Sequence, residues 1–60
     1  MGVDMTNYKM IYENNVYNCI SLIFFFNANV LEELEVVYIN EDNRVSIIKD
    51  YKDNFQFISK

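Results

Sequence analysis

Residues Ile20 to Phe26 form a run that would be apolar on both faces of a β-strand. Successive side chains of a strand point to opposite faces, so a strand with one face in water should alternate apolar and polar residues. In this run Ser21 is the only polar residue. A chain of 60 residues buries only about 60% of its unfolded surface, which leaves little interior for two apolar faces. The second face therefore requires a closed barrel, a covering segment or another protein chain.

Small domains are usually stabilised by disulfides, a metal or oligomerisation. Cys19 is the only cysteine, so no internal disulfide can form, and its place beside the apolar run predicts a buried free thiol. The chain has no histidine, and one cysteine alone cannot make a structural zinc site, so we expect no metal and no other cofactor. Oligomerisation remains, and we expect a homodimer formed through one face or edge of the strand that contains the run.

Short runs of β-branched and aromatic residues, separated by asparagine-rich turns, predict an all-β domain. The expected strands are residues 8–12, 16–26, 33–40, 45–49 and 55–58. A tight turn is expected at residues 13–15 and a hairpin turn at residues 41–44, with Asn43 in the left-handed conformation. Residues 27–29 are expected to end the second strand. Residues 50–54 are polar and suit a single 3₁₀ turn.

Residues 29–34 allow two interpretations. Asn29 and Glu32 have the spacing of a helical capping box, which favours one helical turn before the third strand. The alternation of Leu34, Val36 and Tyr38 with their neighbours favours a strand. We prefer a strand from about residue 33, with a short helical turn before it as the open alternative.

The sequence of four strands, a 3₁₀ turn at residues 50–54 and a short last strand at residues 55–58 resembles the SH3-like barrel. The resemblance implies a small five-stranded antiparallel barrel or a strongly bent meander. The chain has no ALYDY-type strand, no tryptophan and no SxxY pair, so the resemblance to SH3 domains does not extend to polyproline binding. The chain is also similar to short uncharacterised proteins from phages and mobile elements of low-GC Gram-positive bacteria. Its frequent asparagine, isoleucine, lysine and tyrosine residues, which AT-rich codons encode, point to the same source.

We expect residues 8–60 to form a single β domain and residues 1–7 to be a flexible N-terminus. Part of that N-terminus could derive from an expression vector, because Met5 offers a second start. No basic region followed by an apolar region marks a signal peptide. The apolar run is much shorter than the roughly 20 residues that span a bilayer. A cytoplasmic protein without membrane contact is therefore the expectation.

The net charge is −4, from nine acidic and five basic residues. The basic residues are scattered, which argues against binding to a phosphate backbone. Five acidic residues gather in two short segments: Glu32, Glu33, Glu35, Glu41 and Asp42. If they shared one face, the protein could be a phage-type inhibitor that mimics nucleic acid, which is one alternative function. A second alternative is a single-strand nucleic-acid binder, because aromatic side chains stack on bases.

Catalytic groups are scarce. Without histidine the commonest general base is missing, and with a single glycine no glycine-rich phosphate loop is possible. Five tyrosines and five phenylalanines exceed what a small core can hold, and such residues are enriched at protein interfaces. We therefore expect a non-enzymatic protein–protein interaction module or accessory protein. The interface candidates are Tyr17, Ile23, Phe25 and Tyr38.

Overall fold

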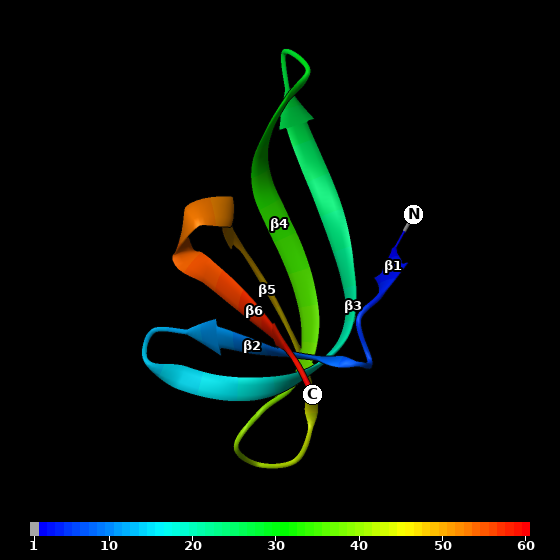
Figure 1. Cartoon of the computed structure of the whole chain (residues 1–60), viewed down its shortest axis with the longest axis vertical. Helices are drawn as coiled ribbons and strands as arrows, with labels where there is room; N and C mark the ends of the chain where they lie inside the picture. Colours follow the sequence, from blue (N-terminus) through cyan, green and yellow to red (C-terminus); the bar gives the residue numbers. More distant parts are fainter. Residues whose placement is uncertain (1) are drawn as a thin grey trace.

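The computed structural model describes residues 2–60 as a six-stranded antiparallel sheet that bends around a small core (Figure 1). The elements in chain order are β1 (Val3–Asp4), β2 (Tyr8–Tyr12), β3 (Asn15–Asn27), β4 (Val30–Ile39), β5 (Val45–Tyr51), the 3₁₀ turn η1 (Lys52–Asn54) and β6 (Phe55–Ser59). The strand order is β5-β4-β3-β2-β6, and β1 pairs with β3 beside this path. The prediction of a small all-β fold is confirmed, and so is the 3₁₀ turn before the last strand.

The alternative of a helical turn at residues 29–34 is wrong, because β4 is already extended from Val30. Ala28 and Asn29 have φ angles of 52° and 66°, and Asn27 pairs directly with Val30 across them. A two-residue turn with positive φ at both positions follows the twist of the strands. It returns the chain straight into β4 and leaves no residues for a helix. Asn43 has a φ of 61°, as predicted.

The N-terminal segment adds a sixth strand to the five that the sequence predicts. Val3 pairs with Leu22 and Asp4 pairs with Ser21. The Met5 side chain is buried, and its backbone N–H donates to the Ile20 carbonyl at 2.9 Å. Where we expect a flexible tail, Val3 and Asp4 instead pair with β3 and Met5 contributes to the core; Met1 lies outside the described residues.

A β-bulge in β3 changes which side chains face the core. Cys19 pairs with Tyr38 and Ser21 pairs with Val37, so Ile20 is an extra residue on β3. Cys19 and Leu22 are therefore both buried, although three positions separate them. A regular strand would place them on opposite faces.

The core lies on the concave face of the bent sheet. Met10 and Val36 are completely buried at its centre, and the remaining members are Met5, Cys19, Leu22, Leu34 and Phe55. The thiol of Cys19 is free and buried, as the sequence predicts. Burial raises its pKa, so the thiol stays protonated at neutral pH.

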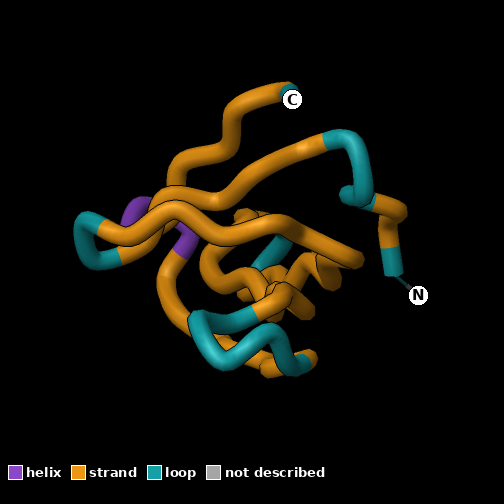
Figure 2. Tube along the Cα trace, turned by 90° about the horizontal axis from the view of Figure 1, so that it is seen from below, coloured by secondary structure: helices purple, strands orange, loops and turns teal. Residues whose placement is uncertain are grey.

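A side-chain hydrogen bond joins β5, at one end of the sheet, to β2, the neighbour of the strand at the other end. β5 and β6 are the outermost strands of the order, and the strands wrap around a common centre (Figure 2). The Tyr12 hydroxyl on β2 donates to the Asp50 carboxylate on β5 at 2.6 Å. The Tyr12 ring also stacks on Phe55, with ring centroids 5.0 Å apart. Side chains thus connect the two ends where strand pairing does not.

Candidate interaction surfaces

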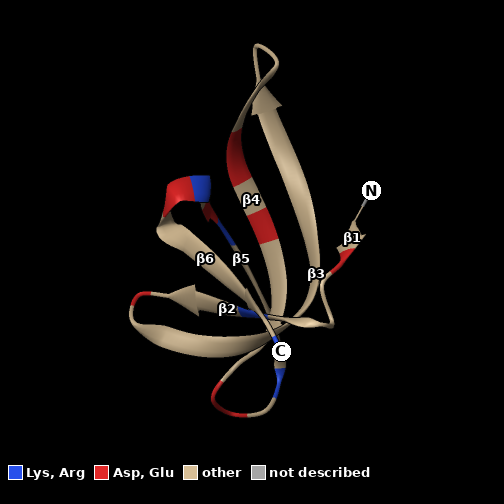
Figure 3. Ribbon diagram, in the orientation of Figure 1, with Lys and Arg blue, Asp and Glu red and all other residues tan. Residues whose placement is uncertain are grey.

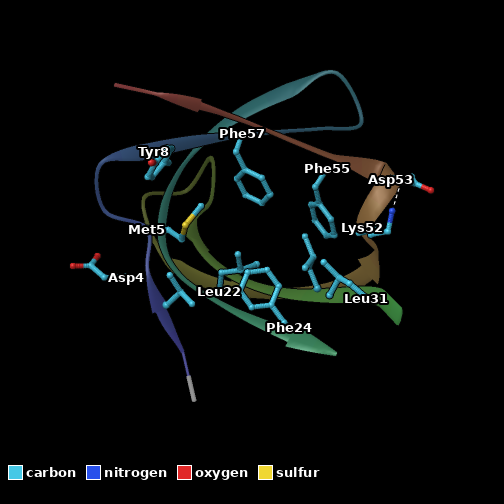
Figure 4. A pocket seen from close by; sticks show the side chains of 12 residues that line it. Asp4, Met5, Tyr8, Leu22, Phe24, Leu31, Lys52, Asp53, Phe55 and Phe57 are labelled. Carbon is cyan, nitrogen blue, oxygen red and sulfur yellow. Dashed lines mark hydrogen bonds and ion pairs between the residues drawn. The ribbon is translucent and has the colours of Figure 1, made fainter. Parts of the chain in front are cut away.

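An apolar cleft of about 610 Å³ opens on the concave side of the sheet (Figure 4). Leu22, Phe24 and Leu31 from the β3–β4 hairpin face Phe55 and Phe57 from β6 across it. The other lining residues are Val3, Asp4, Met5, Tyr8, Leu34, Lys52 and Asp53. A concave apolar site of this size is a usual form of binding site.

The cleft exists because the β3–β4 hairpin extends beyond the strands that could cover it. β2 pairs with β3 only from Asn15 to Asn18, so the second half of β3 projects along the 36 Å long axis of the molecule (Figure 1). Phe24 is 41% exposed and Phe26 is 65% exposed, and the centroids of their rings lie 6.5 Å apart. The concave side of the hairpin is therefore a phenylalanine surface that continues from the cleft.

A second bulge brings Leu31 into this surface. Phe25 pairs with Glu33 and Phe26 pairs with Leu31, so Glu32 is an extra residue on β4. Leu31 therefore lines the same cleft as Leu34, three positions further along. Glu32 itself is exposed and accepts a hydrogen bond from the Asn27 amide at 3.2 Å.

The charged residues at the rim of the cleft are paired locally. Lys52 and Asp53 form an ion pair at 3.1 Å. Asp4 accepts hydrogen bonds from the Thr6 backbone N–H at 2.9 Å and the Thr6 hydroxyl at 2.8 Å, which lower the Asp4 pKa. The carboxylates of Asp4 and Asp53 point away from the cleft in Figure 4. The lining of the cleft is thus mainly apolar, and its charged groups lie at the rim.

The predicted interface residues lie on two opposite faces. Ile23 and Phe25 are half-buried on the convex face, opposite Glu35 and Glu33 of β4. The Lys49 ammonium lies 4.1 Å from the centre of the Phe25 ring, which is a cation–π contact. The convex face is consequently a mixture of apolar and charged side chains.

Tyr17 and Tyr38 instead pack against the concave core, with ring centroids 4.8 Å apart. The Tyr17 hydroxyl donates to the Glu41 carboxylate at 2.8 Å, and this bond raises the Tyr17 pKa. In an unbroken strand Tyr17 would share a face with Ile23, because Ile23 is six positions further along and alternate residues face the same side. The bulge at Ile20 shifts the alternation and separates them.

The acidic residues occupy separate regions (Figure 3). Glu33 and Glu35 lie on the convex face of β4, whereas Glu41 and Asp42 lie in the β4–β5 turn at the other end of the sheet. At about 3.3 Å per residue, the eight positions from Glu33 to Glu41 correspond to roughly 25 Å. This separation does not provide the single acidic face that mimicry of nucleic acid requires.

The cleft was not among the sites that the sequence suggests. The feature of the sequence that indicates such a surface is its excess of phenylalanine over what a small core needs. Where the surplus phenylalanine side chains gather depends on the curvature of the sheet. Within residues 2–60 no group of three or more potential metal-binding side chains occurs.

No family model, curated protein or solved structure matches this chain. Its own residues define it as a small antiparallel β protein with an apolar concave cleft. Among residues 2–60 there is no helix of sufficient length and apolar character to cross a membrane.

Proposed function

We propose that this protein is a non-enzymatic protein–protein interaction module, a cytoplasmic accessory protein of a low-GC bacterium or its phage. The observation that carries the proposal is the apolar cleft between the β3–β4 hairpin and β6. Its occupant would be an apolar side chain or short apolar segment of another protein.

The chemistry of the lining supports a protein partner. Phe24, Phe55 and Phe57 offer rigid aromatic surface, which dominates the energetics of protein interfaces. Sites for small molecules usually add a few convergent polar groups that fix the orientation of the ligand. Here the charged groups are paired at the rim, so burial of apolar surface is the main source of affinity.

The alternative functions have weaker support. Acidic mimicry lacks a contiguous acidic face, because the acids lie at separate places in the sheet. Binding of single strands combines aromatic residues with a basic groove. Among residues 2–60, Lys52 is the only cation that lines the cleft, and Asp53 pairs with it.

Selection from a random peptide library displayed on phage tests the proposal without knowledge of the natural partner. Selected peptides are then titrated against the native protein and against the variants Phe24→Asp and Ile58→Asp. Phe24 and Ile58 are similarly exposed, at 41% and 46%, but only Phe24 lines the cleft. Loss of a central aromatic anchor should weaken binding at least about tenfold, while the control stays within about twofold. Equal affinity for both variants, or failure to select any apolar peptide, would contradict the proposal.

A further inference from the structure

One edge of β3 is unpaired along its second half in the part of the chain that the structure describes. The pairing of β2 with β3 ends at Asn18, and β1 pairs only with Ser21 and Leu22 of β3 (Figure 1). From Ile23 to Phe26 the strand has β4 on one side and no strand of residues 2–60 on the other. An edge with unpaired N–H and C=O groups is a template for another strand.

The alternation of the backbone identifies the free groups. The Ile20 carbonyl faces this edge, because it accepts a hydrogen bond from the Met5 N–H at 2.9 Å. Backbone groups in an antiparallel ladder face one side at every second residue. Leu22, Phe24 and Phe26 therefore direct theirs to the same edge. Leu22 is opposite Val3, and no strand of residues 2–60 pairs with the N–H and C=O groups of Phe24 and Phe26 on this edge.

A second copy of the chain can satisfy all four free groups in one register. If two antiparallel β3 strands are related by a two-fold axis at Phe25, Phe24 of each copy lies opposite Phe26 of the other. Both pairs then exchange N–H···O=C bonds, and the two Phe25 residues form the close, non-hydrogen-bonded pair between them. An axis at Phe24 would require Leu22, which β1 already pairs, and an axis at Phe26 would place Phe24 opposite the turn residue Ala28.

The composition of β3 also favours a second copy. β3 has no charged residue, so two chains of net charge −4 can meet there without like charges in contact. Natural edge strands are usually protected by charges, proline or bulges. Of the two outermost strands, β5 has Lys49 and Asp50, whereas the segment of β3 from Ile23 to Phe26, like β6, has no charge and no proline.

The area available indicates a reversible association. Phe24 and Phe26 are 41% and 65% exposed, which for side chains of about 200 Å² amounts to about 200 Å² of aromatic surface per copy. With the backbone edge added, the interface falls at the low end of specific contacts, below about 1,200 Å² in total. Such interfaces form transiently and depend on concentration.

We propose that the unpaired edge of β3 joins two copies of this chain by antiparallel strand addition centred on Phe25. The sheets of the two copies become continuous, and Phe24 and Phe26 of both copies lie side by side on the concave face. The inference depends on the proposed function only in that both are protein–protein contacts. The peptide titration tests the cleft, and self-association tests the edge, so either can fail alone.

A charge-swap experiment tests the register. Sedimentation of the full chain from about 1 μM to about 1 mM should show its mass rise from 7.2 kDa toward twice that value. Phe25→Glu and Phe25→Lys should each remain monomeric, because like charges meet at the axis. An equimolar mixture should form a heterodimer. A monomeric native chain at all concentrations, or a mixture that does not associate, would overturn the proposal.

Backbone methylation tests the hydrogen bonds without changing a side chain. Total synthesis of the 60-residue chain allows N-methylation of Phe26, which removes a free edge donor and should weaken the dimer at least about tenfold. The matched control is N-methylation of Ile47, whose N–H faces the free edge of β5 by the same alternation. Circular dichroism verifies that each variant is folded. Dimerisation of N-methyl-Phe26 at native strength would refute strand addition, even if the Phe25 variants fail to fold.

Discussion

Two valines with opposite environments provide a direct test of the fold. Val36 lies on the concave face of β4, between Leu22 and Ile48, and is completely buried. Val45 begins β5 and is 63% exposed. Substitution of each by alanine removes the same two methyl groups from a strand, so the difference between the two variants reports burial rather than strand propensity.

The expected magnitudes follow from the burial of each side chain. Loss of two buried methyl groups at Val36 costs about 1.6 kcal/mol in transfer free energy, and the residual cavity raises the total to about 2–3 kcal/mol. Because Val45 is 63% exposed, its substitution by alanine should cost only about 0.6 kcal/mol. A domain of this size is stable by roughly 3–9 kcal/mol, so Val36→Ala should remove a large fraction of the total.

Urea unfolding followed by far-ultraviolet circular dichroism measures both variants. The protein should be dilute, so that association does not contribute to stability. We expect the midpoint of Val36→Ala to shift to clearly lower urea with an unchanged slope. If Val36→Ala destabilises the protein no more than Val45→Ala, the assignment of the concave face of β4 is wrong.

Three further predictions concern the turns and the polar groups. Ala28→Gly should stabilise the protein by about 0.5–1 kcal/mol in urea unfolding, because Ala28 has a φ of 52°; equal or lower stability would contradict this. The Tyr12 hydroxyl lowers the pKa of Asp50, so their bond stabilises the fold above the unfolded-state pKa of about 3.9 and is lost as the pH falls through the folded-state value. Tyr12→Phe should therefore reduce the acid-side slope of stability against pH, and an unchanged slope would count against the bond. Cys19 should react with a thiol reagent only as fast as the protein opens, and addition of urea should accelerate the reaction; rapid labelling of the native protein would show that the thiol is accessible.

The turns illustrate what local chemistry predicts well. Asparagine tolerates positive φ, and Asn14, Asn29 and Asn43 all adopt it in the structure. Short polar segments between β-branched and aromatic runs therefore located the hairpins without tertiary information. The same reasoning underestimated β4, because a helical capping pattern at Asn29 and Glu32 competed with a turn that needs only two residues.

The candidate surfaces were less predictable, since they depend on which way each side chain points. Two bulges, at Ile20 and Glu32, shift the alternation within β3 and β4. The first places Tyr17 on the face opposite Ile23, and the second brings Leu31 into the cleft. A bulge is a property of how two strands pair, so the sequence of one strand does not reveal it.

By itself the sequence determined that the chain is all-β, that its cysteine is a buried free thiol and that no disulfide stabilises the fold, because these follow from residue types and their local preferences. It also showed that the run from Ile20 to Phe26 has more apolar surface than a small interior can hold. Only the tertiary structure decided the position of that surface. Leu22 enters the core, Phe24 lines the cleft, Phe26 extends it, and Ile23 and Phe25 face the convex side. The physical reason is that strand pairing, bulges and sheet curvature arise between segments that are distant in the chain.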